Sequence, residues 1–395
     1  METNLTNLEV FMQVSKKITN IPKWPFADKM EEEAVKEVLA SDSWWRNAGT
    51  QAKLFEKEFA QYHGCKGGFT VANGTVALEI ALKALGIGDG DEVIVPNFTF
   101  YSTVSAVLAV RAVPVLVDVK EDTFCIDPEK IEKAVTHKTK AVIPVHMAGQ
   151  IADMDAINEI AKKHKLFVIE DSAHAHGAMR KEQNAGSFGI MSTFSFQNAK
   201  LITAGEGGII LSNDEKLLNQ VLLEANCGRA EGDTTYQHVL IGGNSRLSEV
   251  QGAILRVQLS RLSEQINLRE KNYKYLAEGL KDIPGIILQT TDEDITVHPH
   301  YMVMFYYDKN AFGRASRAEF VEYLKNAGIP VNRSYECIHK LPVFKTLSEA
   351  AWRMDGTCAN SQRISDEVVC LSHNILLGDA ALINDIVEVI RNFKS

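Results

Sequence analysis

The chain has 395 residues, of which 45% are hydrophobic and 24% charged, a composition typical of globular proteins. Its net charge of −9 argues against nucleic acid as a main partner, and no apolar run approaches the roughly 20 residues that cross a bilayer. The six cysteines form no CxxC pair and the N-terminus does not resemble a secretory signal, so we expect a cytoplasmic protein without a membrane partner.

The N-terminal residues predict helices joined by irregular chain. Residues 1–25 predict a short polar helix followed by a proline-rich arm, and Met30–Ala40 and Gln51–His63 predict amphipathic helices. Between these helices, Ser43–Gly49 contains two tryptophans and an arginine. Because tryptophan is usually mostly buried, we expect a core anchor under a loop; the alternative is the lip of a binding cleft.

From residue 69 onward, short apolar runs alternate with helical patterns. The expected strands are Phe69–Ala72, Glu92–Val95, Val113–Val117, Ala141–Val145 and Leu166–Glu170. The expected helices are Gly74–Leu85, Ser102–Val110, one that begins at Asp127-Pro128, and Met154–His164. This alternation predicts βαβ units, and therefore an α/β fold with a mostly parallel sheet.

The segment Ser192–Gly208 predicts a strand, a turn that carries Lys200, and a glycine-rich return. Phe194 and Phe196 alternate as in a strand with one face in a core. Burial disfavours the charged form of lysine, so a lysine in a buried turn is unusual. Its presence indicates a chemical role for the amine, such as a Schiff base with an aldehyde. The alternative is an ordinary surface lysine before a flexible loop.

The rest of the chain predicts long helices and then a change of character. After the apolar run at residues 208–211 we expect helices at Asp214–Glu224 and from Ser248 through Asn267 toward Leu280. Beyond Gly285 we expect a strand at Thr296–Tyr307, a helix at Arg317–Ala327, extended chain from Val331 and a helix at Ala381–Phe393. We therefore predict an arm (1–29), a large α/β domain (30–275) and a small α+β domain (276–395).

Three features are expected at one edge of the sheet, because ligands bind beyond the carboxyl ends of parallel strands. The helix that opens at Gly74 and Thr75 offers free N–H groups for a phosphate, Asp171 ends a strand, and Lys200 follows another. Together they fit an aldehyde cofactor with a phosphate and a pyridine ring, whose nitrogen a carboxylate keeps protonated.

Two further residues complete this set, and two other interpretations compete with it. Phe100 could contact the ring, and the Ser195 hydroxyl could bind the phosphate. Asp171 could instead cap a turn, or form a metal site with His174 and His176. No other cluster has a metal-ligand spacing such as HExxH, so we expect no metal; neither GxxxxGK[ST] nor GxGxxG is present.

The motifs resemble those of the DegT/DnrJ/EryC1/StrS family of pyridoxal-phosphate (PLP) aminotransferases, which act on keto sugars and cyclitols. The resemblance extends from about residue 22 to the C-terminus and rests on these segments: Asn73–Thr75, Asp91–Pro96, Glu170–Gly177, Phe194–Lys200 and Gly205–Gly208. Within the family, the chain is most similar to 3-amino-5-hydroxybenzoate synthases and scyllo-inosose aminotransferases. The first of these likenesses rests on Trp44–Arg46, Pro144–Gly149, Ala173–His176 and Phe194–Asn198.

The resemblance implies a fold-type I, aspartate-aminotransferase-like fold and a homodimer with shared active sites. It assigns these roles: Lys200 to the Schiff base, Asp171 to the pyridine nitrogen, Phe100 to ring stacking, His174 to the ring hydroxyl or face, Gly74, Thr75 and Ser195 to the phosphate, and Asn244 to the phosphate of the neighbouring subunit. From the sequence pattern alone, Asn244 is a turn residue after two glycines.

We therefore expect an aminotransferase that moves an amino group from glutamate or glutamine to a ketosugar or cyclitol ketone. One alternative is a dehydratase similar to 3-amino-5-hydroxybenzoate synthase, and another is a non-catalytic binding or regulatory protein. Ala199 precedes the lysine where the aromatic-forming enzymes are expected to have glycine, and the presence of Lys200 disfavours the sugar dehydratases that carry histidine there. The substrate-pocket candidates in the small domain are His300, Tyr301, Arg333 and Tyr335, for which packing and surface roles are the alternative.

Overall fold

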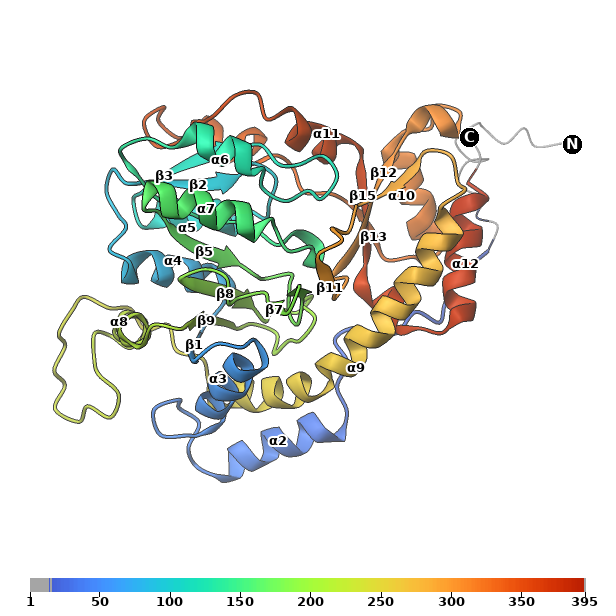
Figure 1. Cartoon of the computed structure of the whole chain (residues 1–395). Coiled ribbons are helices and arrows are strands. Elements are labelled where there is room, and N and C mark those ends of the chain that lie inside the picture. Colours follow the sequence, from blue (N-terminus) through green and yellow to red (C-terminus); the bar gives the residue numbers. More distant parts are fainter. Residues whose placement is uncertain (1–13, 15, 394–395) are drawn as a thin grey trace, which may run out of the picture.

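The computed structural model describes residues 14 and 16–393, and an eight-stranded sheet forms its centre (Figure 1). Its strands, in spatial order, are β1 (Gly67–Val71), β9 (Gly208–Ser212), β8 (Met191–Ser195), β5 (Phe167–Asp171), β4 (Thr139–Val142), β2 (Glu92–Pro96), β3 (Val113–Val117) and β14 (Arg353–Met354). All neighbouring pairs are parallel except those of β9, which is antiparallel to β1 and β8. The predicted mostly parallel α/β sheet is therefore confirmed.

Helices cover both faces of this sheet. They are α3 (Gln51–Tyr62), α4 (Gly74–Ala84), α5 (Ser102–Ala109), α6 (Pro128–Ala134), α7 (Met154–His164) and α8 (Glu215–Ala225), with the 3₁₀ turn η1 (Met147–Gly149). Alternate strand residues enter different cores: Ile94 packs with α6 and α7, whereas Val93 and Val95 pack with α4, α5 and α8. Because both faces are buried, the strands β2 and β3 are almost entirely apolar.

The long helix α9 (Glu249–Leu280) connects the two parts of the molecule (Figure 1). Near its start it packs against α3 and against α2 (Lys29–Ala40). The Glu249 carboxylate accepts a 2.6 Å hydrogen bond from the backbone N–H of Gln51. A Cβ at Gly252 would lie 2.6 Å from the backbone nitrogen of Ala52, so only glycine permits this close helix crossing.

The second part is built on an antiparallel sheet of four strands. In spatial order they are β10 (Ile286–Leu288), β12 (Met302–Tyr307), β15 (Val368–Ser372) and β13 (Val331–Arg333). The helices here are α10 (Arg317–Asn326), α11 (Ala359–Glu367) and α12 (Ala380–Arg391), with the 3₁₀ turns η2 (Lys309–Phe312), η3 (Ile338–Lys340), η4 (Pro342–Lys345) and η5 (His373–Leu377). One aromatic and aliphatic core joins this sheet to α10, α12 and the end of α9.

The expected domain boundary at residue 275 falls inside α9, which continues through it to Leu280. The C-terminal segment also returns to the large sheet, where β14 pairs with β3. The division into residues 30–275 and 276–395 thus stays a prediction. The polar helix expected within residues 1–25 lies largely outside the described residues, and the described part of the arm inserts Ile18 into the smaller core.

Two expectations are wrong. The single strand Thr296–Tyr307 is two strands in different sheets: β11 (Ile295–Val297) pairs with β6 (Met179–Arg180), which pairs with β7 (Gln183–Asn184), whereas β12 belongs to the small sheet. Pro299 provides no N–H for a ladder, and His300 has a positive φ of 48°, so the chain turns between the two sheets.

The second wrong expectation is that Trp44 and Trp45 are buried as a core anchor under their loop. Trp44 and Trp45 are 57% and 48% exposed, whereas the side chain of Arg46 is buried and forms hydrogen bonds of 3.0 and 2.8 Å to Glu56. The arginine, not the aromatic pair, therefore anchors this loop.

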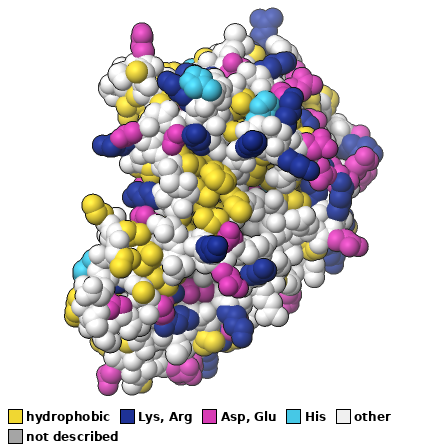
Figure 2. All heavy atoms as spheres, turned by 60° about the vertical axis from the view of Figure 1, so that its left-hand side comes forward, with side chains coloured by type: hydrophobic (Ala, Val, Ile, Leu, Met, Phe, Trp, Pro, Cys, Tyr) yellow, Lys and Arg dark blue, Asp and Glu magenta, His cyan; other side chains and the backbone are white. Residues whose placement is uncertain are grey.

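Apolar side chains gather in patches on the face that Figure 2 shows.

Among the described residues, no helix is long and apolar enough to cross a membrane.

Candidate active site

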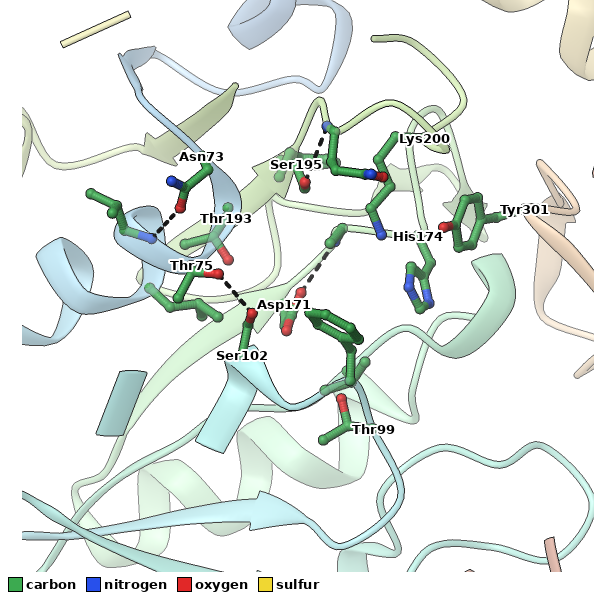
Figure 3. A pocket seen from close by; sticks show the side chains of 18 of the residues that line it. Asn73, Thr75, Thr99, Ser102, Asp171, His174, Thr193, Ser195, Lys200 and Tyr301 are labelled. Atoms are coloured by element: carbon green, nitrogen blue, oxygen red, sulfur yellow. Dashed lines mark hydrogen bonds between the residues drawn. The ribbon is translucent and has the colours of Figure 1, made fainter. Parts of the chain in front are cut away.

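Strand β8 positions the lysine. Phe194 and Phe196 are fully buried in the core shared with α3 and α9, whereas Ser195 points to the opposite face and lines a cavity. After the strand, the backbone N–H of Lys200 closes a turn by donating a 2.8 Å hydrogen bond to the carbonyl of Gln197. The Lys200 amine lies 4.6 Å from the ring centre of Tyr301, and the side chain extends toward Asp171 and His174 (Figure 3).

Asp171 ends the neighbouring strand β5 and is nearly buried. Its Oδ2 accepts a 2.8 Å hydrogen bond from the Thr103 hydroxyl, and its Oδ1 accepts a 3.3 Å bond from the N–H of Ala173. Burial raises the pKa of Asp171, although these two hydrogen bonds and the charge of Lys200 favour ionisation. A cation bound beside it would restore its charge, as a protonated ring nitrogen would do.

His174 belongs to an aromatic group on the same side of the cavity. Its ring stacks on Tyr301 at 4.4 Å and lies parallel to Tyr335 at 6.3 Å, and its Nδ1 accepts a 3.4 Å hydrogen bond from the N–H of Ala148. Burial and the nearby charge of Lys200 hold the pKa of His174 well below its usual value. His174 therefore provides a neutral, flat surface and an Nε2–H donor.

The N-terminus of α4 forms the other end of the cavity. Asn73 caps it by accepting a 2.9 Å hydrogen bond from the N–H of Val76, which leaves the N–H groups of Gly74 and Thr75 for a ligand. The Thr75 hydroxyl lies 2.6 Å from that of Ser102. A Cβ at Gly74 would lie 2.8 Å from the Cβ of Ser195, so glycine keeps this corner open.

These residues line one cavity of about 680 Å³ (Figure 3). Phe100 lies at its wall and is 54% exposed, so one face of its ring is available for stacking. The cavity thus combines an amine, a carboxylate, helix N–H groups beside the Ser195 hydroxyl, and flat rings. This donor set fits pyridoxal phosphate in each of its functional groups.

The structure brings together Gly74, Thr75, Phe100, Asp171, His174, Ser195 and Lys200, as the sequence predicts. It does not place Asn244 there: this residue is exposed, forms an isolated bridge with Asn226, and lies outside the cavity of its own chain. Its expected role in a neighbouring subunit stays a prediction.

The four small-domain candidates have different positions. Tyr301 and Tyr335 line the cavity, whereas Arg333 lies in an adjoining cavity of about 320 Å³ that shares these two tyrosines. His300 is buried between His298 and Tyr273, with ring centres 4.1 and 3.9 Å away, and lines neither cavity. His300 is therefore a packing residue.

Sequence reasoning missed several residues of the cavity wall. They include Thr99, Ser102, Val145, Thr193 and Glu206. Sequence reasoning also missed Thr103, which is fully buried behind this wall. Thr103 is the most informative, since it binds Asp171 directly from the first turn of α5. The signal that could have found it is its place just after the carboxyl end of β2, where ligand-binding loops gather.

The potential metal ligands have separate partners. The His176 Nε2 donates a 2.9 Å hydrogen bond to the carbonyl of Ser195, while Asp171 and His174 bind the groups described above. No group of three or more histidine, cysteine, aspartate or glutamate side chains is arranged to hold a metal within residues 14 and 16–393.

Known proteins resemble the chain in sequence and fold. The 3-amino-5-hydroxybenzoate synthase of Amycolatopsis mediterranei is 38% identical over 95% of this chain and 98% of that protein. An L-glutamine:2-deoxy-scyllo-inosose aminotransferase of Streptomyces lividus is 39% identical over 71% of this chain and 69% of its own length. A crystal structure of 3-amino-5-hydroxybenzoic acid synthase superposes with a TM-score of 0.90 at 37% identity, covering 95% of this chain and 99% of that one.

Residues 25–391 match the DegT/DnrJ/EryC1/StrS aminotransferase family. The chain therefore belongs to this family and is a fold-type I, pyridoxal-phosphate-dependent enzyme, as its sequence motifs predict.

Proposed function

We propose that this enzyme transfers an amino group from L-glutamine or L-glutamate to the ketone of a cyclitol or keto sugar. The observation that carries the proposal is the Lys200 amine, which extends into the same cavity as the Asp171 carboxylate and the free N–H groups of α4. The similarity to an L-glutamine:2-deoxy-scyllo-inosose aminotransferase supports the choice of donor and acceptor.

When bound, pyridoxal phosphate supplies an aldehyde for an amine and a ring that withdraws electrons from it. Asp171 would hold the proton on the ring nitrogen, and Thr103 fixes this carboxylate in place. Gly74, Thr75 and Ser195 would bind the phosphate, and the rings of Phe100 and His174 would contact the cofactor ring.

Lys200 has two tasks in this proposal. Its Nζ would hold the cofactor through a Schiff base, and the same nitrogen would serve as general base and general acid, taking up the proton of the donor's α-carbon and returning it. The Tyr301 ring lies 4.6 Å from this amine and forms the wall of the cavity beside it. Donor and acceptor use the same cavity in turn, which predicts parallel lines in steady-state plots.

We also propose a homodimer in which a second copy completes the site. Exposed apolar side chains gather near Asn244 in the segment that follows α8, where Tyr236 and Val239 are 70% and 69% exposed. The exposed Trp45 lies close by, with the guanidinium of Arg246 5.5 Å from its ring. Such patches are typical of protein interfaces, and an identical subunit would both cover this one and supply Asn244.

The cysteines support a cytoplasmic location. All six are free thiols, and five of them are buried. A chain without disulfides is typical of a reducing compartment.

The first test is an absorbance spectrum of the purified enzyme before and after L-glutamine, beside the Lys200→Ala variant. We expect a visible band from the lysine-bound cofactor, its loss when the donor is added, and no such band in the variant. A wild-type band that ignores glutamine and glutamate would contradict the aminotransferase, and an unchanged band in the variant would contradict the role of Lys200.

A second candidate is a dehydratase similar to 3-amino-5-hydroxybenzoate synthase, favoured by 38% identity over 95% of this chain and by the TM-score of 0.90. It would eliminate water from an aminodehydroshikimate-type substrate and form an aromatic ring. Incubation with such a substrate and with 2-deoxy-scyllo-inosose plus glutamine separates the two candidates. New ultraviolet absorbance in the first mixture supports the dehydratase, and an aminated cyclitol in the second supports the aminotransferase.

A further inference from the structure

Two consecutive backbone carbonyls at the catalytic lysine are held by aromatic rings from distant parts of the chain. The carbonyl of Lys200 accepts a 3.1 Å hydrogen bond from the indole N–H of Trp24, which belongs to the N-terminal arm. The carbonyl of Ala199 lies 3.2 Å from Nε2 of His373, at the start of η5. The lysine turn thus connects the arm to the small domain.

The two rings also contact each other and a buried arginine. Trp24 and His373 pack edge to face with ring centres 4.7 Å apart. The Nη2 of Arg269, on α9, lies 3.3 Å from Nδ1 of His373, and its guanidinium carbon lies 5.5 Å from the centre of the Trp24 ring. A second contact fixes the arm, since the Asn374 side chain donates a 2.7 Å hydrogen bond to the carbonyl of Pro22.

These contacts determine which nitrogen of His373 carries its proton. A guanidinium only donates, so Nδ1 must accept from Arg269. A carbonyl only accepts, so Nε2 must carry the proton and donate to Ala199. Arg269 therefore selects the one neutral tautomer of His373 that can hold the lysine turn.

Arg269 is not an ordinary ion-pairing residue. Its side chain is 0% exposed, no ion pair to it occurs within the described part of the chain, and its Nε and Nη1 have no hydrogen-bond partner there. Burial lowers the pKa of Arg269 to about 9, which reflects the free-energy cost of enclosing this cation. A methionine in its place would avoid that cost, so stability alone does not explain an arginine here.

The turn itself has few other restraints. Gln197–Ala199 are exposed. The N–H groups of Ala199 and Lys200 both donate to Gln197 at 2.8 Å, and the N–H of Gln197 donates to the Ser195 hydroxyl at 3.4 Å. We propose that Trp24 and His373 are positioning residues that clamp the carbonyls of Lys200 and Ala199, with Arg269 orienting His373, so that the Lys200 amine is aimed into the cavity. A displacement of 1 Å at a reacting group costs about a hundredfold in rate.

This inference rests on the proposed function of Lys200, and the holoenzyme tests both. Trp24→Phe removes the N–H donor and keeps the aromatic packing, and His373→Leu removes the second donor. We expect kcat to fall about tenfold or more in each variant with little change in the KM for L-glutamine. The pH midpoint of the visible band of the lysine-bound cofactor should also shift, because the surroundings of the Lys200 nitrogen change.

Two matched variants separate positioning from stability. Trp352→Phe changes a tryptophan that packs against Phe344 and lines neither cavity, and should match the wild type in kcat and in the pH midpoint. Arg269→Met should lower kcat as Trp24→Phe does, while its melting temperature stays at or above that of the wild type. His373→Gln, which restores a donor, should recover part of the activity lost in His373→Leu.

The proposal is overturned if Trp24→Phe and His373→Leu keep the wild-type kcat and pH midpoint. It is also overturned if kcat falls only in variants whose melting temperature falls, and in proportion to that fall. If the Lys200→Ala variant keeps the visible band of the wild type, the proposed function is refuted, and with it the proposed role of Trp24 and His373. A band that requires Lys200 but ignores Trp24→Phe and His373→Leu would refute the clamp alone.

Discussion

The hydroxyl of Thr103 donates a 2.8 Å hydrogen bond to Oδ2 of Asp171 and lies 2.9 Å from the hydroxyl of Thr99. This chain of hydroxyls connects the first turn of α5 to the end of β5, two elements on adjoining sides of the cavity. It fixes the plane of a carboxylate that is otherwise held only by a 3.3 Å bond from Ala173. Since the N–H of a bound ring must meet this carboxylate in a defined direction, Thr103 belongs to the working site.

Thr103→Val tests this relationship, because valine keeps the shape of threonine and removes its hydroxyl. Loss of a hydrogen bond that favours the ionised form raises the pKa of Asp171 further, in addition to the effect of burial. A hydrogen bond to a charged group contributes about 1.5–3 kcal/mol, so kcat and cofactor affinity should fall roughly tenfold to hundredfold.

Thr346→Val is the control, since this exposed hydroxyl donates only to the carbonyl of Val343, outside the cavity. We expect it to leave kcat and the dissociation constant of pyridoxal phosphate unchanged. Wild-type values for Thr103→Val would show that the other contacts suffice to orient Asp171.

Gly74→Ala should impair the binding of the cofactor's phosphate. The new Cβ would lie 2.8 Å from the Cβ of Ser195, so the start of α4 or the end of β8 must move. Overpacking of this kind costs about 1–3 kcal/mol, which predicts a dissociation constant for pyridoxal phosphate raised roughly tenfold to hundredfold.

The matched control for this substitution is Gly88→Ala, where a Cβ would meet only a carbonyl 3.6 Å away. Equilibrium dialysis of both variants gives the comparison. Equal affinities would mean that the cradle tolerates a methyl group, and that Gly74 is not required for phosphate binding.

Much of the large domain could be predicted because its elements follow local patterns. Helix α7 begins and ends where its apolar spacing predicts, and β3 has the predicted bounds. The break between β11 and β12 could also have been found, since Pro299 cannot join a ladder. The pairing of β14 with β3 has no such local signal, because it joins residues more than 230 positions apart.

Some residues of the candidate active site could likewise be predicted from local sequence patterns, and others could not. Asp171 and Lys200 could be predicted because Asp171 ends a buried strand and Lys200 lies just beyond another, where ligands bind in parallel sheets. Trp24, Arg269 and His373 could not, because their roles depend on packing between segments that are distant in sequence. The exposure of Trp44 and Trp45 was mispredicted for a related reason: whether an aromatic residue is covered depends on neighbours that the sequence alone does not reveal.

Shared active sites predict complementation between two inactive variants. A heterodimer of Lys200→Ala and Asn244→Ala subunits has one site with both defects, and one site with Lys200 from one subunit and Asn244 from the other. Since a dimer has two equivalent sites, the purified heterodimer should have about half the wild-type activity, while each parent homodimer is nearly inactive.

Co-expression with two different affinity tags and sequential purification isolates this heterodimer. A heterodimer as inactive as its parents would show that Asn244 serves the site of its own chain, whereas a fully active Asn244→Ala homodimer would show that it serves neither site. A monomeric wild type in light scattering would contradict the homodimer itself.

The stability of the enzyme should fall steeply in mild acid, because it buries neutral histidines. Burial lowers the pKa of the half-buried His339 and of six buried histidines, namely His63, His174, His176, His298, His300 and His373. Below the ordinary histidine pKa of about 6.5, the unfolded chain binds protons that the folded chain excludes. The free energy of unfolding therefore decreases as the pH falls, by about 1.4 kcal/mol per pH unit for each histidine involved.

His63 isolates the contribution of one such group. Its pKa is lowered to about 4 by burial, and its ring lies 4.5 Å from the rings of both Phe59 and Phe194, so His63→Phe replaces it with a ring that fits an aromatic environment. Between pH 6 and pH 5, where only the unfolded state protonates this residue, the variant should lose roughly 1 kcal/mol less stability per pH unit than the wild type. The exposed His137, replaced by glutamine, should leave the slope unchanged. Urea denaturation at several pH values measures these slopes, and equal slopes for His63→Phe and the wild type would contradict a neutral, buried His63.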